Sequence, residues 1–461
     1  MPVGIIGVRP PISPIVITTL LTLLIAALWS LFPHPLIALV AGIALLGLLL
    51  VIHSPVWVGL LFIAFSFFRL HEVFPQLYSF RIPLLLALGT LTTIGWHTLV
   101  TRNITPYNSR ELSAFGIFFL LVTIGLLFAG NRPEAISYWS ATFVKIGIMT
   151  LALAWLLREL DHFRFTLRLL TTTGLAVGLV TLYNKMNGIG LVEGTRVTIG
   201  RSIGSVLGDP NDLALVLLFP LSFALALWLT RGLQWWERGL GLVTSITLVS
   251  AIIATQSRGG LLGIAAICGI YGIYRIHSKL LLGGIGLVGM LGLYLLAGIS
   301  GRQSGGVAES GIDQSAMGRL HAWEAAIGMA TDNPLTGVGL NNFYYNYFYY
   351  SPSWDGLNHA VHSTWFGVLA ETGFVGLIAF VTMVTLTLRS SITTVHKVQH
   401  AASPSPPELR AISEGNLAGL VGFCISGTFL TQGFTWPIYI LLALSVAVAH
   451  YVKSVHSLNL T

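Results

Sequence analysis

Charged residues are scarce in this chain. Only 9% of its 461 residues are Asp, Glu, Lys or Arg, whereas 54% are hydrophobic and the mean hydropathy is +0.80. A soluble domain carries about 25% charged residues, and apolar runs of membrane-spanning length recur along the whole sequence. The composition therefore predicts a polytopic membrane protein rather than an unusually hydrophobic soluble one.

Cysteine and carboxylate side chains are also few. The two cysteines, Cys268 and Cys424, lie in separate apolar segments and provide neither a disulfide framework nor a metal motif. The 24 Lys and Arg residues outnumber the 17 Asp and Glu residues. In a membrane protein the positions of Lys and Arg indicate which loops face the cytoplasm, so their excess is not a signal for nucleic-acid binding.

The apolar runs are long and unbroken, which favours membrane helices over the alternating strands of a barrel. We expect an all-α, polytopic membrane helix bundle with about 12–14 transmembrane helices. The first two are centred near residues 24 and 44, and the segment Val56 to Phe68 is short enough to be re-entrant or interfacial. Residues 1–299 would be transmembrane helices with short loops, 300–361 one long periplasmic loop, and 362–461 the C-terminal transmembrane helices.

The basic residues predict an orientation. They are denser in the loops on the side of the N-terminus, which places both termini in the cytoplasm and the long loop in the periplasm of the inner (cytoplasmic) membrane. Four arginines depart from this tendency and lie in loops rich in Gly, Asn and Asp: Arg196, Arg201, Arg258 and Arg319. Cations on the translocated side are not needed for topology, so they indicate an anionic ligand.

The segment from Gly200 to Ala214 precedes a strongly apolar run. Asp209 or Asn211 is a candidate helix N-cap, and Pro210 suits the first turn. With Arg201 beside it, this helix start is a candidate phosphate cradle. A simple capped turn, or a divalent cation at the acidic residues, remains an alternative.

Two further segments carry arginine at the expected membrane boundary. Arg258 follows Ser257 at the outer end of a span, where a charge is costly unless it is used or reaches the interface. Arg319 and Trp323 have a spacing of four, which predicts one face of a short amphipathic helix. The aromatic run from Phe343 to Tyr350 suits a membrane interface or stacking on sugar rings.

His359 and His362 lie three residues apart at the end of the long loop. Zinc would need a further ligand, and a structural role is the plain alternative. A neutral imidazole at the start of a membrane helix, near several arginines, is better interpreted as a general base. The neighbouring cations would keep the pKa of His362 low enough for it to remain neutral.

These segments together resemble the O-antigen ligase and O-antigen polymerase superfamily of bacterial membrane glycosyltransferases. The most specific element is His362-Ser363, nine residues, then Gly373-x-x-Gly376. Leu377 and Ile378 stand where the family often has two threonines. Other similar elements are Ser257-Arg258-Gly259, Arg319-x-x-x-Trp323 and Pro334-Leu335-x-Gly337-x-Gly339.

The resemblance implies transfer of a glycan from undecaprenyl diphosphate to an acceptor hydroxyl, without metal, cofactor or nucleotide sugar, and with inversion at the anomeric carbon. His362 would deprotonate the acceptor, and arginines would hold the diphosphate as it leaves. The expected catalytic residues are His362, Arg319 and Arg258. The expected substrate-binding residues are Arg201, Arg196, Asp209, Asn211, Trp323, His359 and Glu371.

The acceptor stays open between lipid A core (a ligase), a growing glycan (a polymerase) and a protein hydroxyl (a protein O-oligosaccharyltransferase). A secondary solute transporter is a separate alternative, but it would place polar groups near the bilayer midplane in two related halves. A membrane scaffold would leave the arginines and histidines of the outer face unexplained.

Overall fold

The computed structural model describes residues 51–296, 314–354, 356–401 and 404–458, together with scattered positions between 19 and 49. The described residues form helices and turns, with one isolated bridge between Val192 and Arg196. The all-α prediction is confirmed. The spans expected near residues 24 and 44, and the part of the long loop at 300–313, lie outside the continuously described residues.

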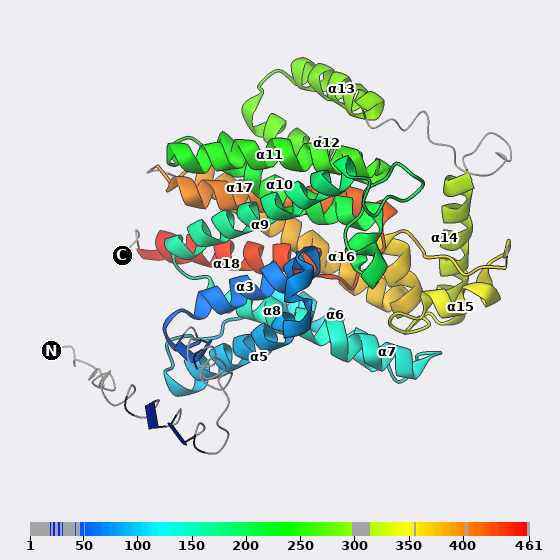
Figure 1. The fold of residues 1–461 in the computed structure, drawn as a ribbon, viewed down its shortest axis with the longest axis horizontal. Helices are drawn as coiled ribbons and strands as arrows, with labels where there is room; N and C mark the ends of the chain where they lie inside the picture. The colour runs from blue at the N-terminus through cyan, green and yellow to red at the C-terminus, as the bar shows by residue number, and fades with distance from the viewer. Residues whose placement is uncertain are drawn as a thin grey trace.

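The helices of the described chain follow one another with short connections, and most run along the same direction (Figure 1). In order they are α3 (Pro55–Ser66), α4 (Leu70–Val73), α5 (Ile82–Gly95), α6 (Arg110–Gly125), α7 (Arg132–Tyr138), α8 (Val144–Leu156), α9 (Leu160–Met186), α10 (Pro210–Leu229), α11 (Trp235–Thr255), α12 (Arg258–Arg275), α13 (Lys279–Leu296), α14 (Gln314–Asp332), α15 (Phe343–Tyr350), α16 (Thr364–Gln399), α17 (Pro407–Ser426) and α18 (Trp436–Leu458).

Within the described residues, seven helical stretches are long and apolar enough to cross a membrane: Ile82–Val100, Arg132–Leu156, Leu160–Met186, Pro210–Leu229, Trp235–Thr255, Thr364–Gln399 and Trp436–Val455. The short segment expected around Val56 is α3. Its residues Leu60, Phe62 and Ile63 are fully buried, so this short helix lies inside the bundle.

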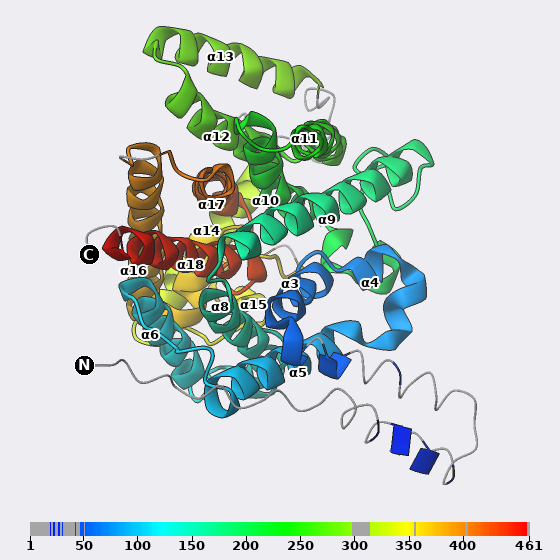
Figure 2. The same ribbon diagram turned by 90° about the vertical axis from the view of Figure 1, so that its left-hand side faces the viewer.

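Helix α10 forms the centre of the bundle. Its residues from Leu213 to Leu227 are buried throughout, and it packs against α9, α11, α12 and α17. A helix that is apolar on all sides is stable only when it is surrounded. Helix α13 is the opposite case, because both views place it at the margin of the bundle (Figures 1 and 2), and Leu280, Leu287 and Val288 are strongly exposed.

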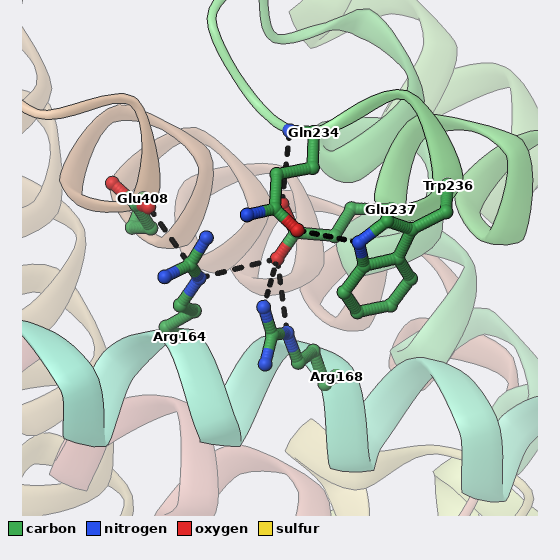
Figure 3. Close-up of polar contacts among 6 residues, drawn as sticks. All are labelled: Arg164, Arg168, Gln234, Trp236, Glu237 and Glu408. Atoms are coloured by element: carbon green, nitrogen blue, oxygen red, sulfur yellow. Dashed lines mark hydrogen bonds and ion pairs between the residues drawn. The ribbon is translucent and has the colours of Figure 1, made fainter.

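Ionic contacts join three helices at one end of the bundle (Figure 3). Glu237 on α11 accepts a hydrogen bond of 2.7 Å from Arg168 and one of 3.3 Å from Arg164, both on α9. Arg164 also lies 3.5 Å from Glu408 on α17. A buried carboxylate is tolerated only when it is paired in this way, so the cluster fixes α9, α11 and α17 to one another.

The segment expected as a long loop contains two helices at the other end of the bundle (Figure 1). Helix α14 contains the predicted Arg319–Trp323 face, and α15 contains the aromatic run. Helix α14 packs against α16 and α15. The connections before α10, α12 and α16 reach the same end, which brings the segments singled out in the sequence together.

Candidate active site

His362 lies immediately before α16 in a constrained backbone. Its φ angle is +46°, a left-handed conformation that is uncommon for residues other than glycine. On its C-terminal side, Ser363 is the N-cap of α16 and accepts a hydrogen bond from the Phe366 amide at 3.5 Å. On its N-terminal side, Val361 is buried. The residues on both sides of His362 therefore hold its backbone in this conformation, and such strain is a common feature of functional sites.

Trp323 attaches α14 to this point. Its indole Nε1 donates a hydrogen bond of 3.1 Å to the Val361 carbonyl, and its ring stacks on Phe366 with a centroid separation of 5.0 Å. Trp323 was predicted to bind substrate, but these contacts give it a positioning role. Because Arg319 lies one turn before Trp323 on the same face, docking of α14 brings Arg319 towards His362.

The electrostatic surroundings of His362 show which predicted residues come together. Burial is the largest effect and lowers the pKa of His362 below its usual value. The charges of Arg319 and His359 lower it further, whereas the carboxylate of Asp209 raises it. The expected lowering of the His362 pKa is confirmed, although burial contributes more to it than the neighbouring cations do. The imidazole is therefore neutral near pH 7 and can accept a proton.

Asp209 is the N-cap of α10, as one of the two candidates predicted. Its carboxylate accepts hydrogen bonds from the amides of Asn211 at 2.7 Å and Asp212 at 3.2 Å. These two bonds cap the helix through one carboxylate oxygen of Asp209. The negative charge of Asp209 also acts on His362. The predicted Pro210 begins the helix, as its fixed φ and missing N–H favour.

Arg196 connects its own loop to the end of α11 and to the start of α10. It is buried, with 4% of its surface exposed, and it donates hydrogen bonds to the Thr255 carbonyl at 3.1 Å and to Asn211 Oδ1 at 2.8 Å. Glu193 lies 3.9 Å from its guanidinium. These contacts favour a positioning role for Arg196 and Asn211, since both side chains tie the start of α10 to the end of α11.

Arg258 and Arg201 lie on exposed turns at the same end. Arg258 is the first residue of α12, whose N-cap Ser257 accepts a hydrogen bond from the Gly260 amide at 3.2 Å. The first turns of α12 and α10 pack closely, because a Cβ at Gly260 would lie 2.9 Å from Ala214 Cβ. The two arginines therefore border the face on which His362 lies.

Glu371 and the Gly-x-x-Gly element hold the turn-rich segment from Asn333 to Phe343. The buried carboxylate of Glu371 accepts hydrogen bonds from the amides of Asn341 at 2.8 Å and Phe343 at 3.3 Å. Glu371 was expected to bind substrate, and this bonding instead favours a positioning role.

Gly373 interrupts α16 with φ +68° and ψ −171°, a conformation that is essentially open to glycine alone. A Cβ there would lie 2.5 Å from the Pro334 carbonyl oxygen. The next amide, at Phe374, donates to that carbonyl at 2.9 Å. The glycine thus lets the turn-rich segment pair with the α16 backbone.

Gln432 is a site residue that the sequence reasoning missed. Its side-chain amide donates to Asp212 Oδ1 at 2.6 Å, and its backbone amide donates to Thr364 Oγ1 at 3.2 Å. It therefore joins the starts of α10 and α16 on either side of His362. The available signal was a polar break, Thr431-Gln432-Gly433, between two apolar segments.

Glu72 is a second residue that was missed. It is buried, forms an ion pair with Arg69, and accepts a hydrogen bond from the Ser205 hydroxyl. This contact anchors the loop that carries Arg201 onto the segment around α4. It has no local sequence signal, because 133 residues separate the partners.

His359 packs edge-on against the buried ring of Tyr347 in α15, with centroids 5.5 Å apart. Phe343 of α15 is also buried, whereas Tyr344, Phe348 and Tyr349 are exposed. Within the described ranges, no three His, Cys, Asp or Glu side chains come together as a metal site would need. The site is thus a half-buried imidazole near Arg319, beside an exposed aromatic surface.

Residues 243–381 match the sequence model of the family described as O-antigen ligase. The chain carries an O-antigen ligase domain. Its boundaries enclose Arg258, Arg319, His359, His362 and Glu371, and they leave the segment from Arg196 to Asp212 outside. No curated protein matches the chain.

The resemblance to the O-antigen ligase and polymerase superfamily is confirmed on these residues. The match to the O-antigen ligase family, together with the long apolar helices of the described residues, indicates a multi-pass membrane protein of the ligase and polymerase type.

Proposed function

We propose that this protein transfers a glycan from undecaprenyl diphosphate to an acceptor hydroxyl at the periplasmic face of the inner membrane, as an O-antigen ligase. The observation that carries the proposal is His362: a half-buried imidazole on a left-handed backbone, with a pKa lowered by burial and by Arg319 and raised by Asp209, inside the segment that matches the ligase family. Both termini lie in the cytoplasm in this arrangement, as the distribution of basic loops predicts.

In the proposed reaction, neutral His362 accepts the proton of the acceptor hydroxyl. The acceptor oxygen forms a bond to the anomeric carbon while the bond from that carbon to the diphosphate oxygen breaks. Configuration inverts because this is a single displacement. Undecaprenyl diphosphate departs with the bonding electrons, and Arg319 stabilises the charge that develops on it.

The remaining residues fall into three groups. Arg258 and Arg201, on exposed turns at the same end, take the outer part of the diphosphate. Trp323, Glu371, Arg196 and Asn211 are positioning residues, because their contacts are made with the protein itself. His359 and Asp209 tune the imidazole of His362 from opposite directions.

The proposal is tested by an in vitro transfer assay with purified protein and an undecaprenyl-diphosphate glycan. Lipid A core, free donor glycan and a protein acceptor are offered separately, with and without EDTA. Product on lipid A core identifies a ligase, product on the glycan a polymerase, and product on protein a protein O-oligosaccharyltransferase. We expect EDTA to have no effect.

His362→Ala should reduce transfer by about 10²- to 10⁴-fold, the usual contribution of a general base. His277→Ala, which changes an exposed histidine outside the site, should leave transfer unchanged. Full activity in a folded His362→Ala protein would contradict the proposed base.

A further inference from the structure

A polar cavity lies at the opposite end of the bundle from His362. It has a volume of about 680 Å³ and is formed by the ends of α10, α12 and α16 and the starts of α11 and α17. Helix α10 begins beside the candidate active site and ends at this cavity. Its 20 residues span about 30 Å, the thickness of the hydrocarbon core. The cavity therefore lies at the other membrane boundary.

The cavity is strongly basic. Four arginines line it, together with His400, and Glu414 is its one carboxylate: Arg231, Arg238, Arg275 and Arg410 are the arginines. Glu414 is already engaged, since it accepts hydrogen bonds from Arg275 at 2.7 Å and from Gln399 at 3.0 Å. In the described part of the chain, Arg231, Arg238 and Arg410 have no carboxylate within ion-pair distance.

Buried donors in the lining lack partners. Among the described residues, Arg410 Nε, Arg275 Nη1 and Thr230 Oγ1 are buried without a hydrogen-bond partner. Thr230 is 1% exposed. An unpaired buried donor costs about 1–3 kcal/mol, and three such donors around one cavity indicate a ligand with several acceptor atoms.

Topology alone does not account for this arrangement. Basic residues are expected at a cytoplasmic boundary, but that tendency requires only charges in contact with water. At the same end, Arg164 and Arg168 are neutralised by Glu237 (Figure 3). Arg231, Arg238 and Arg410 differ because they line the cavity without an ion-pair partner among the described residues.

We propose that this cavity binds a phosphate-bearing ligand, a phosphomonoester or diphosphate group, at the membrane face opposite the candidate active site. Guanidinium groups match phosphate oxygens with paired hydrogen bonds, and the volume is that of a small-molecule site. The phosphate belongs to a membrane lipid headgroup or to a soluble compound. Trp228 and Tyr274 in the lining suit the depth of a headgroup. The inference does not depend on the proposed transfer reaction.

The test uses the full-length protein in nanodiscs at about 0.15 M salt, with two probes. Sodium pyrophosphate, titrated by calorimetry into phosphatidylcholine nanodiscs, represents the soluble source. Phosphatidic acid, a phosphomonoester lipid retained by the protein and counted by native mass spectrometry after release from mixed nanodiscs, represents the headgroup. We expect the wild type to bind one of them, and the probe that binds identifies the source.

A matched pair of variants distinguishes binding in the cavity from a general effect of the protein's positive charge. The Arg231→Gln/Arg410→Gln variant should weaken binding at least about tenfold, because it removes two of the four guanidinium groups that line the cavity. Arg389→Gln removes an exposed charge from α16 outside the cavity and should change binding less than about twofold. Should the double variant fail to fold, Arg231→Gln alone, on an exposed turn, makes the same comparison. Failure of the wild type to bind either probe, or an equal loss in Arg389→Gln, would overturn the proposal.

Discussion

At the scale of single residues, His362 is set apart by its surroundings rather than by its type. Its backbone is left-handed, its side chain is half-buried, and Arg319 and Asp209 act on its charge in opposite directions. Burial penalises the charged imidazolium more than the one nearby carboxylate supports it. The residue therefore stays available as a proton acceptor at a pH where a surface histidine is partly protonated.

The transfer rate should depend on pH through His362. Only the neutral imidazole accepts a proton, so kcat/KM should rise as pH increases through a pKa below 6.5 and then reach a plateau. Arg319→Gln removes a charge that lowers this pKa, so the acidic limb should move to higher pH. A pH–rate profile of both proteins checks this. An unmoved limb would show that Arg319 does not act on the base.

Arg319→Lys tests the diphosphate contact. Lysine keeps the positive charge but loses the planar fork that binds two phosphate oxygens, so transfer should fall at least about tenfold while the acidic limb stays near its wild-type position. Arg389→Lys, on exposed α16 surface, serves as the control. If lysine at position 319 supports the wild-type rate, a charge alone suffices there.

At the scale of elements, helix α16 is kinked because its helical backbone is interrupted at Gly373. The non-helical conformation at Gly373 exposes backbone groups to which the turn-rich segment after α14 bonds, and Glu371 holds the same segment from one turn earlier. Gly373 therefore acts by shaping the backbone of α16 rather than by binding a substrate. It holds the segment between α14 and α15 against α16, close to His362.

Gly373→Ala should destabilise the protein by about 3 kcal/mol or more, because the new Cβ meets the Pro334 carbonyl at 2.5 Å in a conformation that costs about 1–3 kcal/mol by itself. Thermal unfolding in detergent measures this, and transfer should fall with it. Gly116→Ala in α6, where a Cβ meets nothing within 4 Å, is the matched control. Equal melting temperatures for the two variants would contradict this account of the kink.

At the scale of the whole molecule, the bundle separates two polar regions by the length of a membrane helix. The candidate active site occupies the end capped by α14 and α15, whereas the ionic cluster and the basic cavity occupy the other (Figure 1). The two ends are joined through α10, whose buried core has no charged residue between Leu213 and Leu227.

Glu237→Gln should separate stability from catalysis. The substitution removes the carboxylate shared by Arg164 and Arg168 and leaves Arg168 uncompensated, while Arg164 keeps Glu408; this should cost about 3 kcal/mol. The acidic limb of the pH–rate profile should not move, because the cluster lies about 30 Å from His362 along α10. Glu324→Gln, at an exposed position on α14, is the control for stability. A moved limb would reveal coupling between the ends.

The sequence by itself determined the environment, the class of fold and the family. Hydropathy requires spanning helices because lipid leaves no other partner for the backbone, and caps such as Asp209 are local features that spacing reveals. The motif that contains His362 and Gly373 could likewise be recognised from the sequence, because the two residues lie within a dozen positions of each other.

Only the tertiary structure decided which of these residues face one another. Trp323, Glu371 and Arg196 carry polar groups that suit a ligand, yet their bonds go to backbone and side chains brought from elsewhere in the chain. Gln432 and Glu72 gave little or no signal, because their partners lie 220 and 133 residues away. Contacts of that range depend on how the helices pack, and no local pattern records them.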